Sequence, residues 1–276
     1  MKKKNKIPIQ AIVLTLNEEK HILRCIKNLK LNVQKIIVVD SFSSDRTSKI
    51  CKKEKVRFYQ NKFKSHSNQL NWILKKIKKK NIWILRIDAD EIIEKNFFKK
   101  LNLIKNLNDY NAIEFTIEHI FLGNKINFGG VYPQQQIRMW RNKSGIFDNK
   151  PMDEKIKILN PKILKSKIKI IDYNLKGFKF WFTKHNFYAK QESKLFFMYR
   201  NKIKKGLYKN DIFRKKMKYY KFPIFVRPFL LFLYRYILKR GFLDGYVGIK
   251  FCLMQTLYYR LLVDFYIAKS FLIKFK

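Results

Sequence analysis

Four short apolar segments in the first ninety residues restrict the fold most strongly. They read AIVLTL (11–16), KIIVVD (35–40), VRFYQ (56–60) and IWILRID (82–88). Their apolar character is continuous rather than alternating, which is typical of parallel strands that are covered on both faces. Apolar residues at helical spacing lie between them, for example Ile22, Ile26 and Leu29. The pattern predicts a β-α-β-α-β-α-β start, and therefore a doubly wound α/β fold.

The rest of the chain follows a different rhythm. From about Ala112 the apolar residues alternate, and the pair Gly129-Gly130 predicts a turn between antiparallel strands. Beyond about Phe187 the sequence becomes helical and rich in aromatic residues. We therefore predict a Rossmann-like domain with a mostly parallel, mixed sheet over residues 1–190. A basic and aromatic helical extension is predicted to follow over residues 191–276.

Two apolar runs in this extension raise the question of a membrane. They are FPIFVRPFLLFLYRYILKRGF (222–242) and LLVDFYIAKSFLIKF (261–275). Charged residues interrupt both runs well before the ~20 apolar residues that a membrane span needs; these are Arg227, Arg235, Asp264 and Lys269. The pattern fits basic helices that lie in a membrane interface. It also fits a buried helical subdomain whose core is made of Phe and Tyr.

The charge of the chain indicates a polyanionic partner. The 62 Lys and Arg residues against 20 Asp and Glu give a formal net charge of +42. Nucleic acid, an anionic membrane surface or a phosphorylated substrate would each be attracted, although a biased codon supply could account for part of the excess. The interleaved aromatic residues keep a basic nucleic-acid-binding protein open as an alternative, although the lysines form no single stripe.

Cysteine usage and the amino terminus bear on location. Cys25, Cys51 and Cys252 lie far apart without C-x-x-C spacing, so neither a zinc site nor a disulfide framework is indicated, and a reducing cytoplasm is expected. The start MKKKNKIPIQ is basic but has no following apolar region with a small-residue cleavage site. A secretory signal is therefore not expected.

Polar residues gather at the carboxyl ends of the predicted strands. Asp40 ends the second strand, Asp88 and Asp90 end or follow the fourth, and Thr15 to Glu19 follow the first. Ligands of open α/β sheets bind beyond these strand ends, so the four segments are expected to share one crevice. Glu91 adds a third carboxylate within four positions, although like charges so close repel one another.

A divalent cation is the simplest compensation for this crowding. Mg²⁺ or Mn²⁺ held by Asp88 and Asp90 would take its other ligands from substrate phosphates and water, which would make the substrate a diphosphate. The acids could instead be solvated loop residues, with Glu91 and Glu94 favouring the amino terminus of the next helix. Glu91 could also hold the metal ligands in place without binding the metal itself.

Several other kinds of site are excluded or left open. No glycine-rich phosphate loop follows any strand, which argues against a dinucleotide oxidoreductase and a Walker-type NTPase. The four histidines are scattered, and each is better explained as a surface or structural residue than as a catalytic one. In NKPMDEKIKI (149–158), Asp153 and Glu154 could provide a general base for an acceptor hydroxyl, or could only pair with neighbouring lysines.

Together these segments resemble a known family. AIVLTLNEEKHILRCIKNL, KIIVVDSFSSDRTSKI, NQLNWIL and WILRIDADEII are similar to successive motifs of the inverting GT-A glycosyltransferases of family two. LGNKINFGGVYPQQQIRMWRNKSGIFDNKPMDEKI and GFLDGYVGIKF resemble the subgroup with the lipopolysaccharide-core glucosyltransferases. The resemblance covers nearly the whole chain and implies a donor half over about 1–110 and an acceptor half over about 111–190.

The resemblance also implies roles for individual residues. The nucleotide would contact Thr15, Leu16, Asn17 and Glu18, and Asp40 would recognise its base. Asp88 and Asp90 match the motif that holds the metal and the donor diphosphate, and Asn71 matches a position near the donor. Gln136 and Arg138 match a motif near the acceptor and the diphosphate. Glu154 matches the catalytic base, while Asp153 replaces a histidine, so the choice between these two acids stays open.

The function implied by the resemblance is metal-dependent, inverting transfer of a hexose, in the manner of a glucosyltransferase. The donor would be a nucleotide sugar, a UDP-sugar in the first place, with Mg²⁺ or Mn²⁺ as cofactor. The acceptor would be a glycan of lipopolysaccharide, lipooligosaccharide or a lipid-linked oligosaccharide in cell-envelope biosynthesis. The protein is expected in the cytoplasm, peripheral on the inner face of the cytoplasmic membrane, without nucleic acid. A nucleic-acid-binding protein and an inactive GT-A scaffold at the membrane surface are the alternatives.

Overall fold

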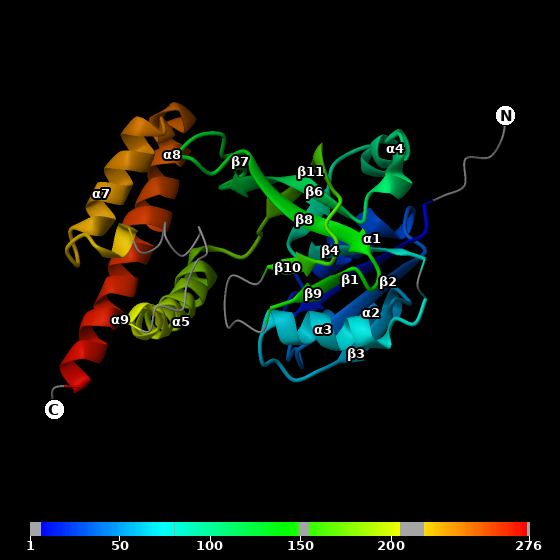
Figure 1. The fold of residues 1–276 in the computed structure, drawn as a ribbon, viewed down its shortest axis with the longest axis horizontal. Helices are drawn as coiled ribbons and strands as arrows, with labels where there is room; N and C mark the ends of the chain where they lie inside the picture. Colours follow the sequence, from blue (N-terminus) through cyan, green and yellow to red (C-terminus); the bar gives the residue numbers. More distant parts are fainter. Residues whose placement is uncertain (1–6, 80, 149–154, 205–217, 275–276) are drawn as a thin grey trace. The chain divides into compact units, whose positions relative to one another are not determined.

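The computed structural model describes residues 7–79, 81–148, 155–204 and 218–274 (Figure 1). Contacts divide the chain into two compact units. The first comprises residues 1–120 and 133–175, and the second comprises residues 121–132 and 176–276. Each unit has a core of its own, so each is described by itself.

The first unit is built on a mixed sheet. Its parallel part has the order β3-β2-β1-β4, formed by β1 (Ile9–Thr15), β2 (Lys35–Asp40), β3 (Arg57–Gln60) and β4 (Trp83–Asp88). These are the four strands predicted from the continuous apolar segments. The sheet continues through β8 (Gln134–Arg141), β6 (Ala112–Phe121), β11 (Ile163–Tyr173) and β5 (Glu91–Ile93). In this second part only the β6–β11 pairing is parallel.

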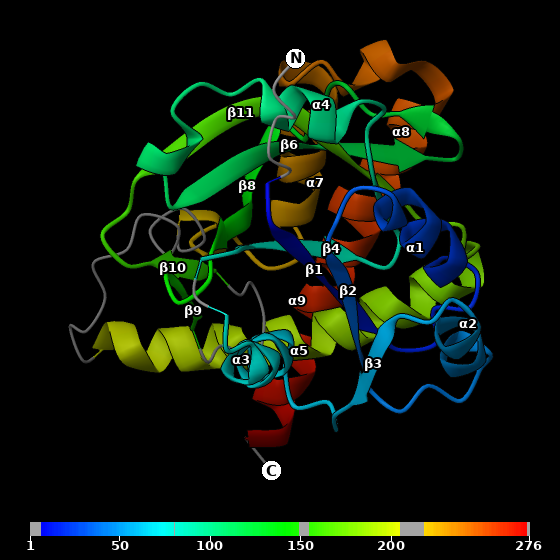
Figure 2. The ribbon, with the colours of Figure 1, turned by 90° about the vertical axis from the view of Figure 1, so that its right-hand side faces the viewer.

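Both faces of the parallel strands are covered, as their continuous apolar character requires. On one face lie α1 (Ile22–Lys30), α2 (Thr47–Lys53) and α4 (Phe97–Asn102), with a 3₁₀ turn η1 (Leu107–Asp109) nearby. On the other face lie α3 (His66–Lys76) and the small ribbon of β9 (Gly145–Phe147) and β10 (Ile156–Ile158). Figure 2 shows α1 and α2 on the opposite side of the strands from α3. The predicted α/β fold with a mixed sheet is confirmed.

In its described residues, the second unit is helical apart from β7 (Asn124–Lys125). Its elements are α5 (Phe178–Lys204), α7 (Arg227–Leu233), the π-helical turn η2 (Tyr234–Leu238), the 3₁₀ turn η3 (Gly241–Asp244), α8 (Gly245–Cys252), the π-helical turn η4 (Leu253–Tyr258) and α9 (Tyr259–Lys274). The core between α5 and α9 is formed by Ala189, Tyr259, Val263 and Ile267. Within the described ranges, no helix is both long and apolar enough to cross a membrane.

The helical part begins earlier than the sequence indicated. We predicted a boundary at residue 190 and helical character from about Phe187, whereas α5 begins at Phe178 and the units divide after Leu175. The side chains of Trp181, His185 and Ala189 recur at i, i+4, and Ala189 lies in the core with α9. The sequence alone does not reveal this series, because other aromatic residues stand before and between its members. The structure leaves several of these exposed, among them Phe178 and Phe182.

A loop from the sheet region also belongs to the helical unit. The carboxylate of Asp244 accepts hydrogen bonds from the backbone N–H groups of Asn127 and Phe128 at 3.0 and 2.9 Å. At Gly241 a Cβ atom would lie 2.9 Å from the Sγ atom of Cys252, and at Gly248 it would lie 2.2 Å from the carbonyl oxygen of Gly241. The segment GFLDGYVGIKF therefore packs this loop and two helical turns tightly together.

Candidate active site

Three predicted site residues meet at the carboxyl edge of the parallel strands. In the register of the sheet, Thr15 lies opposite Asp40, and Leu14 of the same strand lies opposite Asp88. The hydroxyl of Thr15 donates a 2.9 Å hydrogen bond to Asp40, whose side chain is fully buried. The structure thus brings together the ends of β1, β2 and β4, as the strand pattern predicted.

The loops that follow β1 and β2 are joined by hydrogen bonds. The backbone N–H of Asn17 donates to the hydroxyl of Ser43 at 2.8 Å, and that of Glu18 donates to the hydroxyl of Thr47 at 2.8 Å. Ser43 in turn donates its backbone N–H and its hydroxyl to Asp40. Leu16 lies exposed between these bonded residues. The two loops therefore form one fixed polar wall beside Asp40.

His21 has a structural role in this wall. Its ring is fully buried, with Nδ1 2.6 Å from a carboxylate oxygen of Glu18, and Nε2 accepts the backbone N–H of Leu175 at 2.7 Å. Since Nε2 is an acceptor, the proton of the neutral ring lies on Nδ1, where it is donated to Glu18. His21 therefore orients Glu18, in keeping with the structural interpretation of the histidines.

The crowded carboxylates after β4 are compensated by arginine side chains. Arg138 donates to Asp88 at 3.3 Å and to Glu91 at 2.5 Å. Glu91 also accepts the backbone N–H of Asp88 at 2.9 Å, and Arg86 donates to the carboxylate of Asp88 at 3.2 Å. The acids are thus held by two cations of the chain itself, which answers the repulsion that the sequence alone left unexplained.

These contacts set the protonation of both acids. Burial on its own would raise the pKa of Asp88, but the positive charges of Arg86 and Arg138 outweigh it and hold that pKa well below its usual range. Burial raises the pKa of Glu91 to about 8 against the opposing charge of Arg138, and the neighbouring Asp88 adds to the rise. Asp88 is therefore an anion at neutral pH, with 34% of its side chain exposed to a ligand.

Local structure explains how Arg138 and Glu91 come to face each other. The pairing of β6 with β8 skips a residue, since Ile113 lies opposite Met139 and Glu114 lies opposite Ile137. Arg138 is left without a partner residue at this bulge, and bulges turn a side chain away from the regular alternation. Glu91 lies on β5 and not in the first turn of α4, so the suggestion that it favours a helix terminus was wrong.

Asp90 and Asp88 fit a metal only in part. The carboxylate of Asp90 accepts from the amide of Asn174 at 2.9 Å, and its backbone carbonyl accepts from Arg24 and from the N–H of Tyr173. In the part of the chain that the structure describes, no group of three or more His, Cys, Asp or Glu side chains could hold a metal ion. A metal at these two aspartates would need further ligands, which Mg²⁺ and Mn²⁺ commonly take from substrate phosphates and water.

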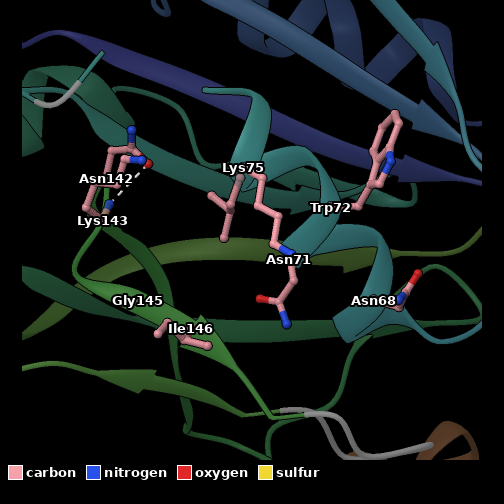
Figure 3. Close-up of a pocket in the computed structure, with 9 residues that line it drawn as sticks. Asn68, Asn71, Trp72, Lys75, Asn142, Lys143, Gly145 and Ile146 are labelled. Atoms are coloured by element: carbon pink, nitrogen blue, oxygen red, sulfur yellow. Dashed lines mark hydrogen bonds between the residues drawn. The ribbon is translucent and has the colours of Figure 1, made fainter. Parts of the chain in front are cut away.

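The other predicted site residues are placed less centrally. Asn71 lies on α3, and its amide exchanges two hydrogen bonds with the backbone of Phe147, at 2.9 and 3.1 Å. Figure 3 shows it reaching from α3 toward the strand of Gly145 and Ile146, in a pocket of about 500 Å³. None of the acids described above lines this pocket. Gln136 is half-buried on β8, opposite Phe115, and Asp153 and Glu154 lie outside the described residues.

Some residues of the site were not predicted. Ser43 follows Asp40 by three positions, and the tendency of an aspartate to accept hydrogen bonds from neighbouring backbone N–H groups could have identified it. Gln69 is buried and donates to the hydroxyl of Ser41 and the carbonyl of Asn61, at 3.2 and 2.8 Å. Its local sequence gives no such signal, because both partners come from other loops.

A further ionisable pair lies on the same sheet. The Nδ1 atom of His119 is 2.9 Å from the carboxylate of Asp172, and Nε2 is 2.8 Å from the side-chain oxygen of Gln134. Asp172 lies opposite His119 on one neighbouring strand and opposite Glu91 on the other. Burial alone would lower the pKa of His119, but the hydrogen bond and charge of Asp172 outweigh it and raise that pKa above its ordinary value.

The raised pKa of His119 predicts a pH-dependent contribution to stability. Because the folded state binds the proton more tightly than the unfolded state, the contribution is full below the unfolded pKa of about 6.5 and is lost as the pH rises through the folded value. The difference in free energy of unfolding between the wild type and His119→Gln should therefore shrink with rising pH. Urea denaturation at a series of pH values measures it, and a constant difference would contradict the protonated pair.

Comparison with known proteins identifies a family. Residues 10–146 match the model described as Glycosyl transferase family 2. The lipopolysaccharide core biosynthesis glycosyltransferase LpsC of Rhizobium meliloti (strain 1021) is 30% identical over 95 residues, which are 33% of this chain and 34% of that protein. The match therefore spans about a third of the length of this relative.

Solved structures also show similarity. TarS from S. aureus has a TM-score of 0.42 and 16% identity, over 61% of this chain and 37% of that chain. Glucosyl-3-phosphoglycerate synthase from Mycobacterium tuberculosis, in complex with Mn²⁺ and UDP-glucose, has a TM-score of 0.35 and 19% identity, over 41% of this chain and 45% of that chain. The resemblance drawn from the motifs is confirmed by the family match, and residues 10–146 of the chain carry a glycosyl transferase family 2 domain.

Proposed function

We propose that the chain transfers a sugar from a nucleoside diphosphate sugar, a UDP-sugar in the first place, to a glycan acceptor. The observation that carries the proposal is the meeting of Asp40 and Asp88 at one strand edge, with Arg138 bound to Asp88. Asp40, which the family motif assigns to the nucleobase and which here holds the loop of Ser43, then lies on the same edge as Asp88, an ionised acid that could bind a metal at the diphosphate. The match of residues 10–146 to the family model supports the same reaction.

The donor side follows from the contacts of these residues. Residues 15–18 and Asp40 would hold the nucleoside, because their loops are already fixed by the hydrogen bonds to Ser43 and Thr47. Asp88 and Asp90 would hold Mg²⁺ or Mn²⁺, which when bound supplies positive charge to the diphosphate. Arg138 keeps Asp88 ionised and adds a fixed positive charge near the leaving group, where charge develops during transfer.

The acceptor side of the proposal rests on the sequence motifs and the relative. Glu154 or Asp153 would take the proton from the acceptor hydroxyl as it attacks the anomeric carbon from the face opposite the departing nucleoside diphosphate, so the configuration would invert. Gln136 would lie near the acceptor. The similarity to LpsC supports a lipopolysaccharide or lipid-linked glycan as acceptor, and such an acceptor favours a peripheral location on the inner face of the cytoplasmic membrane.

A donor screen tests the proposed function. The purified chain would be incubated with UDP-, GDP- and TDP-sugars, with Mg²⁺, Mn²⁺ or a chelator, while donor hydrolysis and the thermal midpoint are measured. We expect one nucleotide sugar to raise the thermal midpoint of unfolding and to be hydrolysed only when metal is present. The reason is that the proposed ligands, Asp88 and Asp90, are carboxylates, which need a metal ion to bind a diphosphate. Salt-sensitive retention on DNA without any effect of a nucleotide sugar would contradict the proposal and favour a nucleic-acid-binding protein.

A further inference from the structure

One segment of the helical unit exposes an unusual amount of apolar surface. Between residues 222 and 246, thirteen large apolar side chains are exposed. They are Phe222, Ile224, Phe225, Val226, Phe229, Leu230, Leu233, Tyr234, Ile237, Leu238, Phe242, Leu243 and Tyr246. Exposed apolar residues scattered singly are ordinary, whereas a contiguous group marks a surface that binds a partner or a membrane. We name residues 222–246, which include α7, η2 and η3, the apolar segment (Figure 1).

The apolar segment is anchored firmly and is not a loose end. Arg227 and Asp264 form a buried ion pair, with Nε of Arg227 2.9 Å from a carboxylate oxygen of Asp264. Asp264 also accepts the backbone N–H of Phe225 at 2.9 Å. Phe225 has a positive φ of 66°, a strained conformation for an aromatic residue that persists only where neighbours hold it. The chain therefore stabilises a turn that leaves the ring of Phe225 exposed.

The exposed charged side chains between residues 218 and 250 are all basic. Lys218, Lys221, Lys239 and Arg240 are exposed, and Lys239 lies over the ring of Tyr234 at 5.5 Å. Between residues 218 and 250 the one acidic residue is Asp244, whose carboxylate accepts the backbone N–H groups of Asn127 and Phe128. Apolar side chains rimmed by lysine and arginine are complementary to the acyl chains and headgroups of an anionic bilayer.

The carboxy-terminal helix differs from this segment, although its sequence looks similar. The residues of α9 at helical spacing, Tyr259, Val263 and Ile267, are buried against α5. For α9 the interpretation as a buried helical subdomain therefore holds. The interrupting charges Arg227 and Asp264 of the two apolar runs are each other's partners, so they report internal packing and not a membrane rim.

We propose that the apolar segment, and not α9, docks the protein on the surface of an anionic lipid bilayer without crossing it. This proposal rests on the proposed function only in that a lipid-anchored acceptor gives such docking a purpose. Phe225, Phe229, Leu233 and their neighbours would enter the boundary between headgroups and acyl chains. Lys221, Lys239 and Arg240 would remain among the anionic headgroups.

Vesicle co-sedimentation with matched variants tests the docking surface. The test pair is Phe229→Gln with Leu233→Gln, at side chains that are 50% and 48% exposed, and the control pair is Phe265→Gln with Leu272→Gln on α9, at 52% and 71%. On vesicles of phosphatidylcholine with phosphatidylglycerol, we expect the test pair to weaken binding about tenfold or more and the control pair to leave it unchanged. Lys239→Gln with Arg240→Gln should reduce the dependence on phosphatidylglycerol.

Other outcomes would overturn the proposal. Equal losses for the test and control pairs would show that α9 contributes as much as the apolar segment, and no loss for either pair would place docking on charge alone. A concentration-dependent dimer of the wild type that the test pair abolishes would show that a second copy covers the segment. Donor hydrolysis, which needs no membrane, is expected to be unchanged in the test pair. Normal vesicle binding by a chain without donor hydrolysis would refute the proposed function and leave the docking surface intact.

Discussion

Replacing Asp90 by Asn is expected to lower metal-dependent sugar transfer about 100- to 1000-fold while the fold is retained. The substitution removes one of the two carboxylates that would hold the metal at the diphosphate. The backbone carbonyl of Asp90, which accepts from Arg24 and Tyr173, is unchanged, and an Asn oxygen can still accept from Asn174. The thermal midpoint without metal should therefore stay close to that of the wild type.

The control for this prediction is Asp109→Asn, an exposed acid outside the candidate site. Initial rates would be measured across a range of Mn²⁺ and Mg²⁺ concentrations for both variants. The site variant should lose its response to metal, and the control variant should keep it. Full activity of Asp90→Asn in the presence of chelator would remove the metal role of this residue. If that activity persisted while Asp88 stayed ionised beside Arg138, arginine side chains alone would neutralise the charge of the diphosphate.

The convergence of Asp40 and Asp88 could be predicted from sequence because it follows from strand order and strand direction. Each acid ends a buried strand, and parallel neighbours end at the same edge. The partners of these acids could not be predicted in the same way. Arg138 is separated from Glu91 by 47 positions and faces it only because β8 carries a bulge. The repulsion between the carboxylates, which suggested a bound metal cation, is thus relieved partly by the long-range contact with Arg138.

The helical unit shows a similar limit. Both apolar runs have the composition of interfacial helices, and composition cannot tell which of them packs on α5. The decisive facts are the burial of Tyr259, Val263 and Ile267 against α5, and the pairing of Arg227 with Asp264, which joins one run to the other across 37 positions. A charge inside an apolar run reads as an interruption until its partner is known. In the structure, α9 belongs to the core of the helical unit and the apolar segment belongs to its surface.

The buried ion pair of Arg227 and Asp264 leads to the second prediction with a large expected effect. Replacing Arg227 by Met should destabilise the helical unit by about 3–5 kcal/mol, because Asp264 would stay buried without its counter-charge. The ring of Tyr220 lies 4.8 Å from the guanidinium, but its hydroxyl already donates to Glu192. Hydrogen exchange of the α9 amides as a function of urea would report the loss in this unit, with the amides of β1 and β2 as an internal reference.

Two companion variants separate the buried pair from arginine loss in general. Arg46→Met removes the partner of Glu19 at a site where the arginine is 79% exposed, and it should cost less than about 1 kcal/mol. The double variant Arg227→Met with Asp264→Leu should recover part of the loss, since no uncompensated charge is then buried. The recovery should be incomplete, because the backbone N–H of Phe225 also donates to Asp264 and would lose its acceptor. If the double variant were no more stable than Arg227→Met, that N–H bond and the turn it fixes would be the main contribution of Asp264.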